Sequence, residues 1–199
     1  MAYGVKGNRK LQIGKSSAGE NVAATTVLRG EGVITDNIKV VFPKEDTGIA
    51  PGTDRSYVPE KSGMLALASG PATFEQLGYI LNMGIQGSTG VQDSTSGSGY
   101  VYTHTPFTTT QRVPYFYTVE AGNNAEEEEM DFCFAKDFVI EGKSNEAIMR
   151  SANILGRQVA VAAYTTAVSI PTVEEMLFNM GKVYIDATST SIGTTQVTN

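Results

Sequence analysis

The stretch MDFCFAKDFVIEG, residues 130–142, has the alternation of a long strand with one face in the core and one face in water. Successive side chains of a strand point to opposite faces, so the two parities of this stretch define two surfaces. One parity carries the apolar residues Met130, Phe132, Phe134, Phe138 and Ile140. The other parity carries Asp131, Asp137, Val139, Glu141 and Lys143. The pattern predicts a half-buried strand whose phenylalanines face the core.

Further strands are predicted on both sides of this stretch. Residues 143–145 have the composition of a turn, and residues 146–169 return as a second extended segment, which would make a hairpin. Upstream, GVITDNIKVVF at residues 32–42 is rich in β-branched residues and is followed by a proline, which favours a strand that stops there. Two short strands complete the prediction, at residues 64–69 and 182–187. The chain is therefore expected to be mainly β.

Two similar phrases, PATFEQLGYILNMG at residues 71–84 and PTVEEMLFNMG at residues 171–181, predict two helices. Each opens with a capping box, in which a threonine hydroxyl and a Gln or Glu side chain satisfy free backbone N–H groups. The boxes pair Thr73 with Gln76, and Thr172 with Glu175. Glycines that can end a helix follow, at Gly84 and Gly181. One apolar stripe is expected to pack each helix on the core: Phe74, Leu77 and Leu81, then Val173, Met176, Leu177 and Met180.

The remaining segments are polar or rich in glycine and proline, and they are predicted to be arms or loops. Residues 1–30 are either an arm that orders against a neighbouring molecule or a frayed terminus. Residues 43–63 form a long charged loop, which is unusual in a compact domain unless the loop has a function. Residues 86–99 are a flexible linker within a domain of residues 31–199. The acidic run at residues 126–129 is either a solvated loop or part of a charged wall.

The composition limits the possible classes of function. The chain has 199 residues, 41% of them hydrophobic, and can bury a sizeable core. Its 21 acidic and 15 basic residues give a net charge of −6, which argues against a protein that grips a phosphate backbone. The single cysteine, Cys133, lies between two phenylalanines and is predicted to be a buried thiol. No apolar run reaches the roughly 18 residues of a membrane span, and no signal peptide pattern is present, so synthesis in a cytoplasm is expected.

Enzyme signatures are incomplete in this sequence. QIGKSS at residues 12–17 resembles the end of a phosphate-binding loop, but Arg9 stands where the first glycine of that motif is required. The one histidine, His104, has no second histidine for a metal cluster and lies in a threonine-rich segment unsuited to a catalytic triad. Adjacent acids such as Glu174 and Glu175 are explained by the dipole of the predicted helix. The sequence therefore predicts no catalytic residues, no metal site and no cofactor.

Five phrases, in their order along the chain, resemble the major tail proteins of long-tailed bacteriophages, which are the subunits of the tail tube. The match covers residues 22–199, and GTDRSYVP and PATFEQL are its most specific parts. The phrases are VVFPKEDTGIAPGTDRSYVPE, PATFEQLGYILNMGI, CFAKDFVIEG with GRQV, VEEMLFNMGKVYID, and IGTTQ.

The resemblance implies a mainly β fold with flanking helices: a β-sandwich or partial barrel whose long hairpins complete an intersubunit β-barrel tube. It implies rings, usually hexameric or pseudo-hexameric, stacked around a channel for ejection of viral DNA. The implied partners are further copies of the chain and the tape-measure and tail-completion proteins, while DNA passes without sequence-specific binding. Neither a cofactor nor membrane insertion is implied. The expected location is the virion tail, after assembly in the host cytoplasm.

Two sets of residues are candidates for assembly. The charged loop is expected to contact the next ring through Lys44, Glu45, Asp46, Asp54, Arg55 and Tyr57. The polar face of the hairpin between residues 131 and 153 is expected to line the channel, because a neutral or acidic wall does not bind the phosphates of passing DNA. Its candidates are Asp131, Asp137, Glu141, Lys143, Glu146 and Arg150.

A second interpretation is a monomeric carbohydrate- or receptor-binding β-module. Residues 100–122 alternate aromatic residues or valine with threonine and contain two prolines, as edge strands do. Aromatic platforms of this kind bind sugars, but the chain contains no tryptophan, which disfavours this interpretation. The two functions differ in solution, because a tube subunit forms rings or polymers at high concentration and a binding module stays small.

Overall fold

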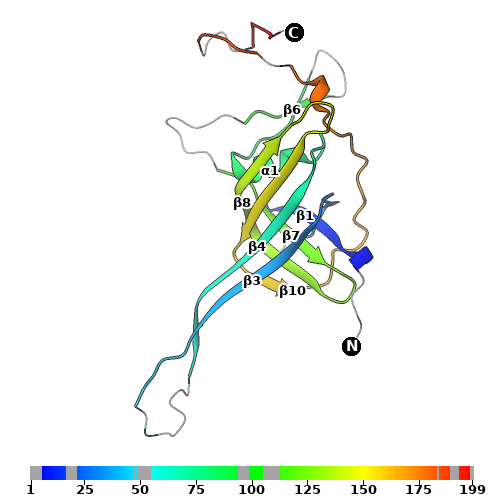
Figure 1. Ribbon diagram of the computed structural model, residues 1–199. Helices are drawn as coiled ribbons and strands as arrows, with labels where there is room; N and C mark the ends of the chain where they lie inside the picture. The colour runs from blue at the N-terminus through cyan, green and yellow to red at the C-terminus, as the bar shows by residue number, and fades with distance from the viewer. Residues whose placement is uncertain are drawn as a thin grey trace.

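The computed structural model describes residues 6–16, 22–46, 48, 55–93, 99–104, 113–182, 184–188 and 193–197. Its main element is one antiparallel sheet of eight strands in the order β2-β1-β7-β8-β9-β4-β3, with β10 paired to β8 (Figure 1). The strands are β1 (Lys10–Ser16), β2 (Thr26–Val27), β3 (Gly32–Val41), β4 (Tyr57–Pro71), β7 (Phe116–Gly122), β8 (Glu127–Glu141), β9 (Met149–Gly156) and β10 (Val159–Val161). A separate two-stranded sheet joins β5 (Val91–Gln92) to β6 (Tyr100–Val101), and the one α-helix described is α1 (Leu77–Gly84).

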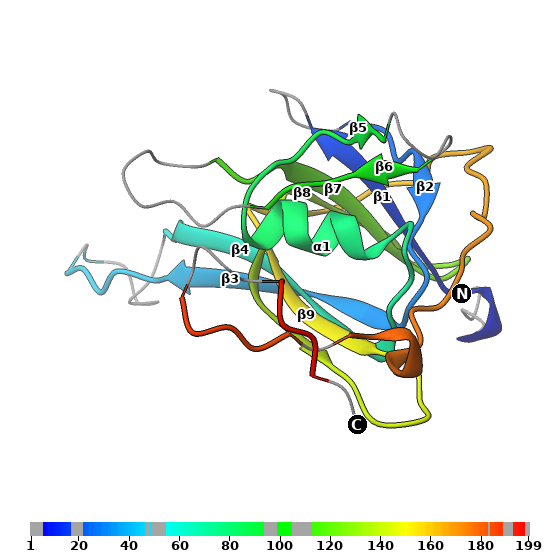
Figure 2. The same ribbon diagram turned by 90° about the horizontal axis from the view of Figure 1, so that it is seen from above.

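Strand β8 belongs to both halves of the sheet. Its first half, up to Cys133, pairs with β7 and β10, whereas residues 134–141 pair with β9. One buried cluster contains side chains of β1 and β7 from one half and of β4 and β9 from the other, so both halves share a core. Figure 2 shows α1 alongside β8, and Gly84 of α1 lies against the Phe138 ring so closely that a Cβ there would be 2.7 Å from it. No closed barrel forms from the described residues.

The parity predicted for β8 is wrong between its two irregular positions. Phe132 has a positive φ of 49°, which reverses the alternation, so that Cys133 and Ala135 are buried instead of Phe134, which is 38% exposed. A second irregularity between Ala135 and Asp137 restores the predicted order for Phe138, which packs on the core, whereas Ile140, also predicted to face the core, is 43% exposed. A bulge cannot be read from an alternating pattern, because it changes which residues count as alternate.

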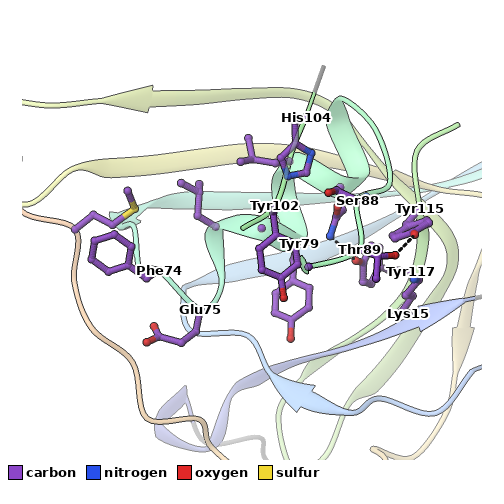
Figure 3. Close-up of a pocket in the computed structure, with 16 residues that line it drawn as sticks. Lys15, Phe74, Glu75, Tyr79, Ser88, Thr89, Tyr102, His104, Tyr115 and Tyr117 are labelled. Atoms are coloured by element: carbon purple, nitrogen blue, oxygen red, sulfur yellow. Dashed lines mark hydrogen bonds between the residues drawn. The ribbon is translucent and has the colours of Figure 1, made fainter. Parts of the chain in front are cut away.

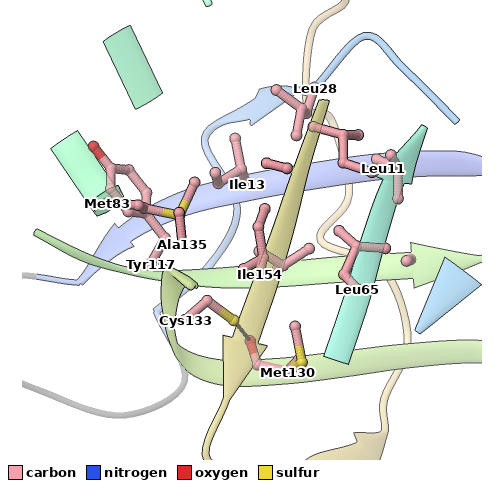
Figure 4. Close-up of a cluster of buried hydrophobic side chains, with 14 of the residues drawn as sticks. Leu11, Ile13, Leu28, Leu65, Met83, Tyr117, Met130, Cys133, Ala135 and Ile154 are labelled. Carbon is pink, nitrogen blue, oxygen red and sulfur yellow. Dashed lines mark hydrogen bonds between the residues drawn. The ribbon is translucent and has the colours of Figure 1, made fainter. Parts of the chain in front are cut away.

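The core itself is tightly closed around Met130 and Cys133 (Figure 4). Met130 fits between Gly63 of β4 and Gly156 of β9, where added Cβ atoms would lie 2.6 Å from its Sδ and 2.1 Å from its Cγ. Cys133 is fully buried and its thiol donates to the carbonyl of Met130 at 3.1 Å, which confirms the predicted buried thiol. Burial raises the pKa of that thiol.

Part of the predicted N-terminal arm is a strand of this sheet. β1 pairs with β7 along its whole length and with β2, and the side chains of Leu11, Ile13 and Leu28 are buried in the shared core. The described part of residues 1–30 is therefore joined to the body of the molecule. Its apolar content was thin but sufficient for one central strand.

The first predicted helix exists, but it is shorter and its capping box does not form. α1 begins at Leu77, and the Gln76 side chain bonds the backbone of Arg29 and Val27 instead of capping the helix. The buried apolar residues of α1 are Ile80 and Met83, whereas the first residue of the predicted stripe, Phe74, is exposed. Gly84 is the last residue of the helix, but it does not form the predicted left-handed cap, because the C-cap position is Ile85 and Gly84 has no positive φ.

The second predicted helix is wrong. Residues 171–181 contain one 3-10 turn, Phe178–Met180, and are otherwise extended, and Leu177 of the predicted buried stripe is 40% exposed. The two similar phrases instead lie side by side: Thr73 bridges Glu175, and the Met176 N–H donates to the Ala72 carbonyl at 2.9 Å. Pairing between backbones thus outweighed a modest helical pattern.

The other predicted elements have mixed outcomes. The strand at residues 32–42 is confirmed as β3, and the turn at residues 143–145 is confirmed. The short strand at residues 64–69 is part of the much longer β4, which takes in the second half of the predicted loop. The acidic run enters β8, so a solvated loop is wrong for its last three residues, and the expected final strand is only an isolated bridge between Tyr184 and Gln196. Among the described residues, no helix is long and apolar enough to cross a membrane.

Candidate functional site

The β3–β4 hairpin projects from the body of the molecule (Figure 1). Within β4, Gly63, Leu65 and Leu67 are buried, whereas every residue from Tyr57 to Lys61 is exposed. β9 begins to pair with β4 only at Gly63, so the outer part of the hairpin is a two-stranded ribbon. This ribbon nevertheless carries large apolar side chains in water: Ile38, Val40, Phe42, Tyr57 and Val58. Exposed apolar side chains gathered on one projecting element are typical of an interaction site.

The described ends of the loop that joins β3 to β4 are held together by one ion pair. The Arg55 guanidinium binds the Glu45 carboxylate through two bonds, one of them from Nε to Oε2 at 3.0 Å. This pairing lowers the pKa of Glu45 and raises that of Arg55. Lys44 and Asp46 are exposed beside it, and Asp54 lies outside the described residues. The structure therefore brings together Glu45 and Arg55 from the predicted contact set, and their contact with another ring stays a prediction.

The half-sheet β8-β9-β4-β3 has two open edges in the described part of the chain. β3 pairs only with β4, and residues 134–141 of β8 pair only with β9. No backbone hydrogen bond from outside these ladders reaches either edge among the residues described. Unpaired N–H and C=O groups along a strand are a template for pairing with another chain. After the projecting hairpin, the two open edges are therefore the second candidate site for contact with another chain.

The outer face of this half-sheet carries part of the predicted channel set. Asp137 accepts a hydrogen bond from Asn153 Nδ2 at 2.7 Å across the β8–β9 pair, and Glu141 lies on the same side four residues further along β8. Lys143 and Glu146 are exposed in the turn that follows. These four residues lie where a channel could reach them.

Asp131 and Arg150 do not, and both are corrections to the predicted set. Asp131 is buried, and its carboxylate binds Arg157 Nη2 at 2.5 Å. Arg150 lies on the inward parity of β9, where its Nη2 donates to the Arg29 carbonyl and burial lowers its pKa. Neither side chain can line a channel in this fold.

A buried carboxylate, Glu120, was not identified from the sequence. It accepts hydrogen bonds from the Thr165 N–H at 2.7 Å and from the Ala24 N–H at 3.3 Å, and it also binds the Thr165 hydroxyl. These bonds link β7 to two segments that are distant in sequence. They also offset the free energy that burial of the carboxylate charge costs. Its role is structural, and no signal in the sequence separates it from the solvated acids nearby. No cluster of three or more His, Cys, Asp or Glu in the described segments could hold a metal ion.

Comparison with known proteins gives little beyond the fold just described. No protein-family model matches the chain, and no match is found among curated proteins. Among solved structures, the chain is similar to the anti-feeding prophage cap, the cap that terminates the tube of that particle. The TM-score is 0.45 at 8% identity, with 82% of this chain and 93% of the cap chain covered. A similarity at this level establishes neither a common fold nor a common function.

Proposed function

We propose that this chain is a structural subunit of a phage-tail-like tube, in which copies join side by side into rings and the rings stack. The observation that carries the proposal is the half-sheet β8-β9-β4-β3 with an open edge on each side. The resemblance of the sequence to tail tube subunits agrees with it. The role is structural rather than enzymatic.

The strand directions favour closure of a ring. All three pairs in the half-sheet are antiparallel, so its outermost strands, β8 and β3, run in opposite directions. When β3 of one copy lies beside residues 134–141 of the next copy, the new pair is also antiparallel. Each copy then adds four strands to one continuous barrel, and the last copy pairs with the first. Closure leaves no open edge, which is what limits aggregation of such sheets.

The outer face of the half-sheet would then line the channel. By strand register its charged residues are Lys39, Glu60, Asp137 and Glu141. These four paired residues sum to a charge of −2 for each copy, and Lys136, exposed at the irregularity between Ala135 and Asp137, has no position in the register. Phosphates gain affinity by releasing counterions to clustered Lys and Arg, so a weakly acidic wall lets DNA pass without being held.

The projecting hairpin would contact the neighbouring ring. Its apolar side chains are exposed in the single subunit, and burying them removes about 25 cal/mol of unfavourable free energy per Å² of apolar surface. Every contact recurs at each position of the ring, so a modest contribution per copy becomes large for the assembly. The partners in this proposal are further copies of the chain, with tape-measure and tail-completion proteins at the tube interior and ends. The location is the virion tail, after assembly in the host cytoplasm.

Sedimentation and negative-stain electron microscopy of the purified chain over a range of concentrations test the proposal. We expect rings or tubes from the wild-type chain, and folded single subunits from a Phe42→Ser, Val58→Ser variant. The matched control is Val161→Ser on β10, because Val161 is 90% exposed but lies off the hairpin; this variant should assemble normally. A wild-type chain that stays monomeric at every concentration would contradict the proposal and favour a monomeric binding module.

A further inference from the structure

A pocket of about 530 Å³ lies between α1, β7 and the segment that contains Ser88 and Thr89 (Figure 3). Four tyrosines line it: Tyr79, Tyr102, Tyr115 and Tyr117. Its size is within the range of small-molecule sites, about 300–1,000 Å³. Nothing in a tube subunit that assembles through strand edges and a hairpin requires such a pocket.

Two of the rings are held in place by glycines. The Tyr102 ring packs on Gly90 and the Tyr115 ring on Gly87, so closely that added Cβ atoms would lie 2.7 Å and 2.3 Å from ring carbons. Lys15 also makes a cation–π contact with the Tyr115 ring, with its Nζ 3.4 Å from the ring centroid. Tyr102 is 52% exposed and borders the pocket, so its ring offers a fixed apolar platform there.

The pocket also contains a hydrogen-bond acceptor that no described residue satisfies. His104 Nδ1 lies 3.1 Å from the Gln86 carbonyl and therefore carries the proton of the neutral ring. Its Nε2 atom is then an acceptor, and it is buried with no partner among the described residues. A buried polar atom is stable only when it is paired. A ligand hydroxyl is a suitable partner, because it can donate to Nε2 and accept from another group.

The charges around the pocket favour a neutral ligand. The charged residues among those lining it are Lys15 and Glu75, which sum to zero when His104 is neutral. Lys15 is engaged with the Tyr115 ring, and Glu75 accepts a hydrogen bond from the Glu174 N–H at 3.0 Å. We propose that this pocket binds a short neutral saccharide, with a sugar ring stacked on Tyr102 and a hydroxyl bonded to His104 Nε2. This site functions whether or not the chain assembles into tubes.

Saturation-transfer NMR with three neutral probes, maltotriose, cellotriose and triacetylchitotriose, tests this inference on the full chain. We expect transfer to at least one probe. Its Kd should rise about tenfold or more in Tyr102→Ala, as loss of one stacked ring predicts, and severalfold in His104→Leu. The control is Tyr100→Ala, which removes an exposed tyrosine of β6 that does not line the pocket and should leave binding unchanged. Tyr102 is exposed, so its variant should fold even if the His104 variant does not.

Three results would overturn the inference. The first is that none of the probes shows transfer to the folded wild-type chain. The second is equal weakening by Tyr100→Ala and Tyr102→Ala, which would mean nonspecific contact with exposed tyrosines. The third is a Tyr102→Ala variant that binds probe normally but loses self-association in sedimentation, which would assign the pocket to a segment of a second copy.

Discussion

The two ends of strand β4 both carry apolar side chains, but these side chains are buried at one end and exposed at the other. From Gly63 to Leu67 the strand has neighbours on both sides, and every second side chain is buried in the core. From Tyr57 to Lys61 it has one neighbour, and all its side chains are in water. A two-stranded ribbon is marginally stable on its own. The inner end therefore belongs to the core of the molecule, whereas the outer end is exposed and, in the proposed assembly, is covered by another copy.

The largest effect expected at the inner end follows from shortening Leu65, which is 0% exposed. Leu65→Ala should lower the free energy of unfolding by about 2–5 kcal/mol, because burial is lost and a cavity remains. Urea denaturation of the single subunit measures it. The control is Leu177→Ala, since Leu177 is 40% exposed, and we expect a loss below about 1 kcal/mol there. Equal losses would show that Leu177 is buried after all.

Two glycines of β4 allow a finer test of the same strand. A Cβ at Gly63 would lie 2.6 Å from Met130 Sδ, whereas a Cβ at Gly70 would meet no atom within 4 Å. Gly63→Ala should therefore lower the free energy of unfolding by about 1–3 kcal/mol through overpacking. Gly70→Ala should be neutral or stabilising by up to about 1 kcal/mol, because the unfolded chain loses entropy. A Gly63 variant as stable as the Gly70 variant would mean that the core has room that the structure does not show.

A buried tyrosine makes the stability of the core depend on alkaline pH. Burial raises the pKa of Tyr117 to about 12, above the value of about 10 expected in the unfolded chain. The folded state favours the neutral phenol, so this contribution is fully present below pH about 10 and is lost as the pH rises toward 12. Denaturant midpoints measured between pH 9 and 12 should fall for the wild-type chain and fall less for Tyr117→Phe. Identical pH profiles would show that Tyr117 does not cause the loss of stability at alkaline pH.

The smallest effect on the single subunit is expected at the loop of the hairpin. Glu45→Gln breaks an exposed ion pair with Arg55 and should leave the melting temperature of the single subunit unchanged. The bond to Arg55 lowers the pKa of Glu45, so the pair persists above the usual glutamate pKa and is lost as the pH falls through the lowered value. Assembly of the wild-type chain should weaken at that acidic limit, and assembly of Glu45→Gln should not respond to it. A clear drop in melting temperature would place the pair in the folded core of the subunit.

Features with a local signal in the sequence were predicted better than features that depend on distant contacts. The β-branched run of β3 and the turn after β8 are local signals, and both were found where expected. The parity of β8 and the helix at residues 171–181 depended on distant contacts: a bulge at Phe132, and the pairing of Met176 with Ala72. No pattern within a short window contains such information.

Predictions for the candidate site also succeeded where the signal is local and failed where it depends on distant contacts. Exposed charges such as Glu45, Asp137 and Glu141 were identified because charged side chains are normally solvated. Asp131 and Arg150 were misplaced because both are buried against partners distant in sequence, the Arg157 guanidinium and the Arg29 carbonyl. The apolar side chains of the hairpin were missed, since an isolated valine or phenylalanine predicts burial rather than exposure.

The most direct test of the central claim is an electron cryomicroscopy reconstruction of the assembled wild-type chain, with the strands resolved at the contact between neighbouring copies. We expect β3 of one copy to pair antiparallel with residues 134–141 of the next, so that a continuous barrel surrounds the channel with Asp137 and Glu141 on its inner wall. A reconstruction in which β3 faces solvent, or in which neighbours meet only through other strands, would contradict it.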